Sequence, residues 1–265
     1  MLPGVSEVQN PHRPVGFRNS AKPGLAYTGA MSTPYRLHYA PDNASLVIRL
    51  ALEEMGLPYQ TVLVDRRAEG QRAPAYLALN PNGLIPVLET PKGAIFETAA
   101  ILLWLVDRHE VMGPQVTAAD RAAFLKWLFF VSNTLHADAR ILFYAHLYAG
   151  PDAAAQDQVR AQVESRIARH LELLEDVAGA GCSFLGAEEV GVLDGYVACL
   201  MRWVQLYPAD RDKGWFSPGA MPHLFDMLTR LERRPSALAA IDAEWLGPTP
   251  FSNPRHPQPP EGSAT

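Results

Sequence analysis

The stretch Asn80-Pro-Asn-Gly-Leu-Ile-Pro-Val-Leu-Glu89 places a turn and then a proline at the start of an apolar run typical of a strand. Because Pro86 has no N–H to give to a strand ladder, it must begin the strand rather than lie inside it. An ordinary trans Ile85–Pro86 bond allows this, and base rates favour it, since only about one X–Pro bond in twenty is cis. A cis bond would instead turn the N–H and C=O of Ile85 outward, where they could pair with an extended peptide ligand.

A second candidate site is the pair Glu97 and Thr98, which stands where an apolar helical pattern begins. A hydroxyl beside the free N–H groups and the positive dipole end of a helix suits a carboxylate ligand. The Glu97 carboxylate suits an ammonium group. The pair therefore matches the two charges of an amino acid. The plainer alternative is that Thr98 only caps the helix that runs to Arg108.

The hydrophobic period of the chain changes once, and this change separates the candidate residues above from a helical second half. Strands alternate with helices up to about residue 110, whereas from Ala118 onward the spacing is helical throughout. The sequence thus predicts a βαβ unit, a ββα unit and then an all-helical domain. The predicted strands are 35–39, 59–64, 85–89 and 94–96, and the predicted helices are 45–55, 98–108, 118–148, 153–178, 192–207, 222–234 and 236–245.

Both ends of the chain are expected to lie outside the folded domains. Residues 1–33 contain prolines and glycines without a continuous apolar core, so we expect a disordered leader rather than a secretory signal. Residues 247–265 are dense in proline, which cannot donate helix or strand hydrogen bonds, so we expect a disordered tail. The domains are then predicted at 34–110 and 118–246.

Composition and charge argue against several classes of partner. The 265 residues carry a formal net charge of -5 with scattered Lys and Arg, which gives no basic footprint for nucleic acid or an anionic membrane surface. The apolar runs are too short to cross a bilayer. Cys182 and Cys199 are the only cysteines, too few and too far apart for a disulfide framework, a zinc site or a C-x-x-C pair. We therefore expect a cytoplasmic protein without a metal, a nucleic-acid partner or a membrane partner.

Taken together, the βαβ-ββα order, the Pro86 motif, the Glu97-Thr98 pair and the helical second half resemble the cytosolic glutathione S-transferase superfamily, in its bacterial type, of the beta-like or a related class. The resemblance implies a thioredoxin-like α/β domain with a mixed four-stranded sheet, followed by an all-α domain. It implies that the Ile85–Pro86 bond is cis and that the main chain of Ile85 pairs with the cysteinyl unit of glutathione. Glu97 and Thr98 would bind the γ-glutamyl end, and the protein would be a homodimer.

The junction Ala40-Pro-Asp-Asn-Ala-Ser-Leu46 is where the resemblance places the group that holds the glutathione thiol as a thiolate. A free thiol ionises near pH 8.5, so donors at the sulfur must lower its pKa by roughly two units. Bacterial relatives carry a cysteine where this chain has Ala44. The catalytic candidates are therefore the hydroxyl of Ser45 first, the amide of Asn43 second and Tyr39 third. Asn43 and Ser45 are also ordinary N-cap residues for the next helix.

Other positions depart from the family pattern or extend it. Leu84 replaces a Lys or Gln that many members use to reach the glycyl carboxylate of glutathione, so that contact must come from elsewhere or be weak. Asp194 matches a buried Asp of a core helix, but Gly191 offers no hydroxyl for the reciprocal capping bond. We expect His136 to pack rather than act as a base, because thiolate addition removes no proton from the electrophile. The candidate wall residues for the second substrate are Phe129, Asn133, His136 and Arg140.

Three functions fit these expectations. The first is a glutathione transferase that conjugates the thiolate of glutathione to an apolar electrophile, and it fits best. The second is a glutathione-dependent lyase, isomerase or reductase on the same fold. The third is a binding or regulatory protein without turnover, since a fold does not dictate a function.

Overall fold

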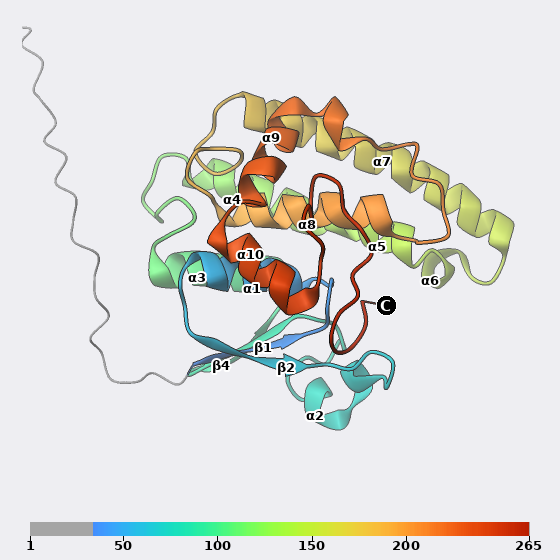
Figure 1. The fold of residues 1–265 in the computed structure, drawn as a ribbon, viewed down its shortest axis with the longest axis horizontal. Helices are drawn as coiled ribbons and strands as arrows, with labels where there is room; N and C mark the ends of the chain where they lie inside the picture. The colour runs from blue at the N-terminus through green and yellow to red at the C-terminus, as the bar shows by residue number, and fades with distance from the viewer. Residues whose placement is uncertain (1–33, 265) are drawn as a thin grey trace, which may run out of the picture. The chain divides into compact units, whose positions relative to one another are not determined.

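The computed structural model describes residues 34–264, which begin with a mixed sheet of four strands (Figure 1). The strand order is β2-β1-β3-β4. The first two strands pair in parallel and the other pairs are antiparallel, with Leu37 opposite Leu88 in the central pair. The expected leader, residues 1–33, lies outside the described residues. The strands are β1 (Tyr35–Tyr39), β2 (Tyr59–Leu63), β3 (Val87–Thr90) and β4 (Gly93–Phe96).

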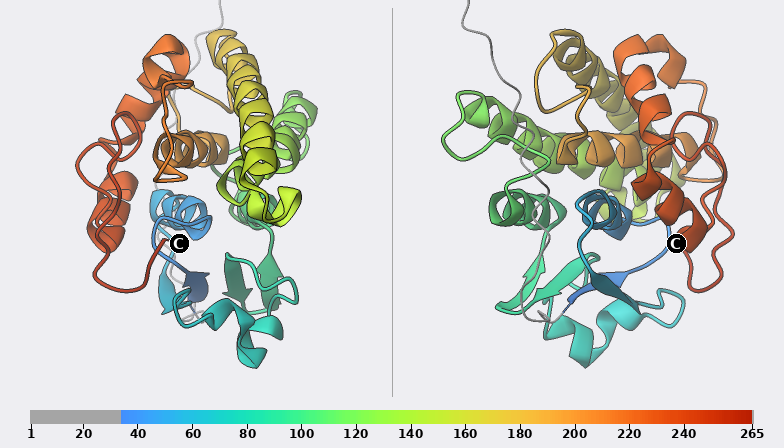
Figure 2. Two further views of the ribbon diagram at one scale, coloured as in Figure 1. Left: turned by 90° about the vertical axis from the view of Figure 1, so that its right-hand side faces the viewer. Right: turned by 60° about the vertical axis from the view of Figure 1, so that its left-hand side comes forward.

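Helices cover both faces of this sheet (Figures 1 and 2). The apolar helices α1 (Ser45–Glu54) and α3 (Thr98–His109) lie on the face that meets the rest of the molecule (Figures 1 and 2). The short helix α2 (Pro74–Leu77), which follows a turn of 3₁₀-helix at Gly70–Arg72, lies on the opposite face. The predicted βαβ-ββα order of a thioredoxin-like domain is confirmed.

The described chain from Thr98 to Ala264 contains helices and turns and no strand, as predicted. The long helix expected over 118–148 is interrupted: a π-helical stretch at Val131–His136 joins two α-helices, and a short helix follows. Stretches of π-helix often occur at functional sites. The helices are α4 (Arg121–Phe130), α5 (Ala137–Phe143), α6 (His146–Ala149), α7 (Ala153–Gly179), α8 (Val192–Leu206), α9 (Pro222–Leu231) and α10 (Pro235–Glu244), with a 3₁₀ turn at Pro218–Ala220.

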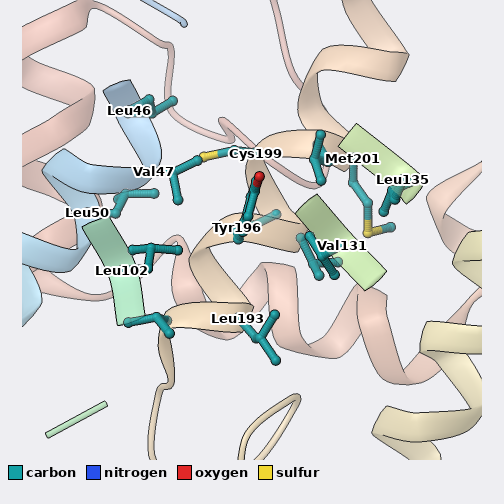
Figure 3. Packing of buried hydrophobic residues seen from close by; sticks show 14 of the residues in the cluster. Leu46, Val47, Leu50, Leu102, Val131, Leu135, Leu193, Tyr196, Cys199 and Met201 are labelled. Atoms are coloured by element: carbon teal, nitrogen blue, oxygen red, sulfur yellow. The ribbon is translucent and has the colours of Figure 1, made fainter. Parts of the chain in front are cut away.

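One hydrophobic core joins the sheet helices to the helical half (Figure 3). Helix α8 is buried along almost its whole length, and its Tyr196 lies among Leu50 of α1, Leu102 of α3 and Val131 of the π-helical stretch. Burial of one apolar side chain of this size contributes about 1.5–3 kcal/mol. The two halves therefore hold each other in place, while the exact domain boundaries at 110 and 118 stay a prediction.

The segment after α10 differs from the disordered tail that its proline content predicts. Residues 247–264 form no helix or strand, yet they run back past α10 toward the sheet (Figure 1). Phe251 is fully buried, and its N–H donates to Glu232 over 2.7 Å. Proline lacks a donor but keeps its carbonyl, and the buried Arg202 donates to the carbonyl of Pro250 over 2.9 Å. The buried Arg202 therefore gives this segment hydrogen bonds in place of those that a helix or strand would supply.

None of the helices in the part of the chain that the structure describes is both long and apolar enough to span a membrane. Cys182 and Cys199 are both free, and Cys199 is fully buried in α8.

Candidate active site

A cavity of about 920 Å³ opens between the sheet domain and the helical half. Its first wall consists of the loop after β1, the segment from β2 to β3, and the start of α3. Its second wall consists of the π-helical stretch, α5, α6 and the end of α8, and the C-terminal segment forms a third. The lining residues used below are Asp42, Asn43, Ala44, Arg66, Arg67, Gln71, Arg72, Leu84, Ile85, Pro86, Glu97, Thr98, Ser132, His136, Arg140, Phe143, Tyr144, Leu147, Tyr196, Trp203, Tyr207, His256, Pro257, Pro259, Gly262, Ser263 and Ala264.

The Ile85–Pro86 bond is cis, as the family resemblance implies. The loop before it is held by its own side chains: the hydroxyl of Tyr76 and the amide of Asn80 each donate to the carbonyl of Leu84 over 2.7 Å. No hydrogen bond between described residues uses the N–H or C=O of Ile85. An unpaired main chain at the rim of a cavity is a ready partner for an extended peptide.

Glu97 and Thr98 lie at the start of α3 and line the same cavity. Glu97 has a φ of 73°, a region that costs a residue with a side chain about 1–3 kcal/mol. Its carboxylate forms no ion pair with another described residue. Thr98 is the first helical residue and is buried, so the cap that the plainer interpretation assigns to it is not formed. The Glu97 carboxylate and the free N–H groups at the start of α3 therefore remain available to a ligand.

The hydroxyl of Thr98 belongs to a buried polar cluster around Tyr196. Burial raises the pKa of the Tyr196 hydroxyl, and hydrogen bonds from Ser132 and Thr98 act in the opposite direction. The same hydroxyl lies 2.8 Å from Nδ1 of His136. Tyr196, Ser132, Thr98 and His136 therefore form one polar cluster in the wall of the cavity.

Ser45, the first catalytic candidate, does not line the cavity. It is fully buried, and its hydroxyl donates to the carbonyl of Ala40 over 3.0 Å and accepts from the N–H of Ala40 over 3.3 Å. Both hydrogen-bonding functions of the hydroxyl are thus used to join the end of β1 to the start of α1. The capping alternative is not met either, because Ser45 makes no side-chain cap for its helix.

Tyr39, the third candidate, is also directed away from the cavity. Its hydroxyl donates to Glu261 of the C-terminal segment, and burial together with that carboxylate raises its pKa. Asn43, the second candidate, does line the cavity and is half-buried. Its Oδ1 accepts from the N–H of Ala44 over 2.9 Å, and its Nδ2 has no partner among the described residues. A free amide donor at the start of α1 is therefore the group that faces the cavity.

The loop that carries Asn43 is held by the residue before it. Asp42 has a φ of 47° and is buried, and its carboxylate accepts two hydrogen bonds from Arg202, at 2.7 and 3.0 Å. The indole of Trp203 and the hydroxyl of Tyr207 each donate to the same carboxylate over 2.8 Å. Helix α8 of the helical half thus fixes the loop of the sheet domain that presents Asn43.

Known proteins resemble this chain and show which family it belongs to. A family model described as the N-terminal domain of glutathione S-transferase matches residues 44–108. Glutathione S-transferase GST-4.5 of Xanthomonas campestris pv. campestris is 30% identical over 171 residues, which cover 63% of this chain and 81% of that relative. The chain belongs to the glutathione S-transferase family.

Two further relatives show how far the likeness to this family extends. The disulfide-bond oxidoreductase YfcG of Escherichia coli is 29% identical over 222 residues, covering 80% of this chain and 96% of YfcG. The solved structure of a sphingomonad glutathione S-transferase complexed with glutathione is 25% identical, with a TM-score of 0.65 over 80% of this chain and 100% of that one. Both halves of the fold are therefore shared with other family members.

Leu84 departs from the common family pattern, and the structure places basic and amide groups near it. Leu84 is exposed at the cavity, and Gln71 and Arg72 line the same part of it. The guanidinium of Arg72 lies beside Gly83, and no hydrogen bond between described residues uses the Nε2 donor of Gln71. These two side chains are available to a ligand carboxylate in place of the residue that Leu84 lacks.

Two of the four candidate wall residues line the cavity and two do not. His136 and Arg140 do, whereas Phe129 and Asn133 are exposed on the helix and do not. The π-helical stretch changes the phase of the helix at this point, so spacing counted at 3.6 residues per turn assigns some side chains to the wrong face. Burial and then the charge of Arg140 lower the pKa of His136 to about 4, which keeps it neutral near pH 7.

Asp194 has the buried structural role that the family resemblance implies. Its two carboxylate oxygens accept from the N–H groups of Gly186, over 2.7 Å, and Gly191, over 2.6 Å. Gly191 has no hydroxyl to complete the reciprocal bond, as the sequence indicates. Burial raises the pKa of Asp194 to about 6.

The C-terminal segment forms a cavity wall, anchored by a buried charge, that the sequence pattern did not predict. Pro257, Pro259 and Gly262 line the cavity. The guanidinium of Arg202 donates a hydrogen bond to the carbonyl of Arg255, which directly precedes this stretch of the segment. An arginine inside the apolar pattern of 192–207 was the available signal, because a buried charge requires partners. No group of described residues has the His, Cys, Asp and Glu composition that could hold a metal ion.

Proposed function

We propose that this family member is a transferase that joins the thiolate of glutathione to an apolar electrophile. The observation that carries the proposal is that Asn43, Ile85, Glu97 and Thr98, from three separate segments, line one cavity. They offer an amide donor, an unpaired main chain, a carboxylate and a helix start. Glutathione presents the matching groups: a thiolate, a peptide unit, an ammonium and a carboxylate. The relative complexed with glutathione supports this assignment.

In this proposal Asn43 replaces Ser45 as the group that stabilises the thiolate. The free Nδ2 of Asn43 donates to the sulfur, and the positive end of α1 favours the negative charge. The sulfur then attacks an electrophilic carbon and a C–S bond forms. In a substitution the leaving group departs with its electron pair. Catalysis rests on thiolate stabilisation and proximity, and it requires no base for the electrophile.

The glycyl carboxylate of glutathione is assigned to Arg72 and Gln71. Both line the cavity beside Leu84, where many family members carry the residue for this contact. A charge-assisted hydrogen bond from Arg72 is worth roughly 1.5–3 kcal/mol. This assignment explains how binding is kept although Leu84 has no polar group.

The test is an ultraviolet difference titration of the thiol of bound glutathione in the wild type, Asn43→Ala and Ser45→Ala. We expect the wild type to ionise the thiol roughly two units below free glutathione. Asn43→Ala should raise that pKa by about one unit or more, because it removes a hydrogen bond to a charged group. Ser45→Ala should leave the thiol pKa unchanged and lower the stability.

Each other outcome has a definite meaning. A loss of the pKa shift in Ser45→Ala alone would restore the first interpretation of the sequence and remove Asn43 from the mechanism. Binding of glutathione without any shift in the wild type would identify a binding protein rather than a transferase.

A second candidate is a glutathione-dependent disulfide reductase, which the likeness to YfcG favours. In that reaction two glutathione molecules reduce one disulfide and leave as oxidised glutathione. Neither Cys182 nor Cys199 lines the cavity, and burial raises the pKa of the Cys199 thiol, so a protein thiol would take no part. Rates of oxidised glutathione formation and of conjugate formation, measured on the same preparation, separate the two. The homodimer and the cytoplasmic location stay predictions.

A further inference from the structure

The cavity is lined by more positive charge than glutathione requires. Arg66, Arg67, Arg72 and Arg140 line it, and none of them forms an ion pair with a carboxylate within residues 34–264. The carboxylates in the lining are Asp42 and Glu97. Asp42 is neutralised by Arg202.

The two carboxylates of glutathione account for only part of this charge. In the proposed function the γ-glutamyl carboxylate lies at the start of α3, and the glycyl carboxylate lies beside Arg72. Both positions belong to the sheet domain. Arg140 stands on α5, one turn after His136, in the wall that the helical half contributes. An arginine in that wall faces the second substrate.

Arg140 of the helical half and Arg66 of the sheet domain contact the same aromatic side chain. The guanidinium of Arg140 lies 5.8 Å from the ring centroid of Tyr144. Nη2 of Arg66, from the segment after β2, donates to the Tyr144 hydroxyl over 3.1 Å. Two guanidinium groups without a carboxylate partner therefore contact one tyrosine. Phe143 and Leu147, which are close to Tyr144 in the sequence, add apolar lining to the same cavity.

We propose that the second substrate is an aromatic or similarly apolar electrophile that carries a carboxylate or an equivalent anion, which Arg140 binds at Tyr144 with help from Arg66. The inference rests on the proposed function and narrows its substrate class. The apolar body packs against Phe143 and Tyr144, and the anion pairs with a guanidinium that has no other carboxylate. The neutral state of His136, one turn away, adds no competing charge at pH 7.

Arg140 is partly buried in the cavity wall. Its charge, after burial, contributes to the lowered pKa of His136. A partly buried pair of this kind is screened by salt less than a surface pair. Arg66 also donates to the carbonyl of Ala264 and so holds the C-terminal segment. Arg140 is therefore the better residue to substitute, because a change at Arg66 would also release the C-terminal segment.

The test compares two electrophiles of the same shape, 4-chloro-3-nitrobenzoate and the neutral 4-chloro-3-nitrobenzamide. With either one, the sulfur of glutathione forms a bond to the ring carbon that carries chlorine, and chloride leaves with the electron pair. Each kcat/KM is divided by the rate constant of the uncatalysed reaction with glutathione, which removes the difference in ring activation. We expect the corrected ratio of benzoate to benzamide to exceed about ten in the wild type.

The variant Arg140→Gln should lower this ratio about tenfold, because the charged hydrogen bond is lost. The matched control is Arg169→Gln, since Arg169 is exposed on α7 and does not line the cavity. It should leave the ratio unchanged. A wild-type ratio near one, or a ratio that Arg140→Gln does not change, overturns the proposal. A salt dependence of the ratio in the wild type that Arg140→Gln abolishes supports it.

A binding measurement separates a failure of this inference from a failure of the proposed function. The conjugates S-(4-carboxy-2-nitrophenyl)glutathione and S-(4-carbamoyl-2-nitrophenyl)glutathione are titrated calorimetrically into the wild type and Arg140→Gln. Tighter binding of the carboxy conjugate that depends on Arg140 supports the anion site even if neither electrophile is turned over. Equal affinity of the two conjugates for the wild type overturns it even if both electrophiles are conjugated.

Discussion

The guanidinium of Arg202 and the carboxylate of Asp42 are fully buried and form two parallel hydrogen bonds, at 2.7 and 3.0 Å. The same guanidinium donates to the carbonyls of Pro250 and Arg255, at 2.9 and 3.0 Å. One side chain of α8 therefore anchors both the loop that presents Asn43 and the segment that forms the third wall of the cavity. A change at Arg202 must affect both.

Arg202→Met should lower the free energy of unfolding by about 3–5 kcal/mol, because it leaves the Asp42 carboxylate buried without its charge partner. Tyr207→Phe removes one neutral donor to the same carboxylate and should cost about 1.5–3 kcal/mol. The double variant Arg202→Met with Asp42→Asn should recover part of the loss, since no unpaired charge remains. Urea unfolding measures all three. A double variant no more stable than Arg202→Met would show that the charge is not the cause.

Removal of residues 257–265 tests the C-terminal wall. A stop after His256 keeps the buried Phe251 and the contact of Arg202 with Arg255, so the fold should be retained. It removes the hydrogen bonds to Glu261 and Ala264, and it removes Pro257 and Pro259 from the cavity. Because the two prolines form part of the apolar wall, the KM for the electrophile should rise about threefold, which corresponds to ~0.65 kcal/mol. Steady-state kinetics with saturating glutathione measures it, and an unchanged KM would remove this segment from the substrate site.

Gly83→Ala should weaken both stability and glutathione binding. Gly83 has a φ of 61°, and an added Cβ would lie 2.9 Å from the main-chain oxygen of Gln71. Gly56→Ala is the matched control, since Gly56 has a φ of 64° but nothing within 4 Å of an added Cβ. Both variants carry the cost of the left-handed backbone, about 1 kcal/mol, and only Gly83→Ala adds a main-chain clash. Thermal unfolding and glutathione affinity should therefore separate them, and equal effects of the two changes would contradict the clash.

The acid stability of the protein should depend on His136. Burial and then the charge of Arg140 lower its pKa in the folded state to about 4 from the ordinary 6.5, so the unfolded chain binds more protons between these pH values. Stability from this residue is present above pH 6.5 and is lost as the pH falls toward 4, by about 3 kcal/mol in total. His136→Asn, which keeps an acceptor for Tyr196, should show a flatter dependence. Urea unfolding between pH 4 and 7 measures it, and parallel curves for the two proteins would contradict the prediction.

The sequence by itself determined the order of the helices and strands and the main-chain segment at Ile85 that faces the ligand. Period-two and helical spacing predicted the βαβ-ββα order and the helical second half, because burial of one face imposes that periodicity locally. The sequence also predicted two parts of the site from local chemistry. The Pro86 motif follows from the missing N–H of proline, and the Glu97-Thr98 pair follows from the free N–H groups at a helix start. Ile85, Glu97, Thr98 and Asn43 do line one cavity.

Tertiary structure alone decided which of several chemically suitable side chains faces that cavity. Ser45 and Asn43 are two residues apart and equally suited to a thiolate, but the carbonyl and N–H of Ala40 take the hydroxyl of Ser45. The order of the proline-rich segment likewise depends on Arg202, which is 48 residues from Pro250. Hydrogen bonds between distant residues leave no periodic signal in the sequence, because they depend on where the folded core brings each side chain.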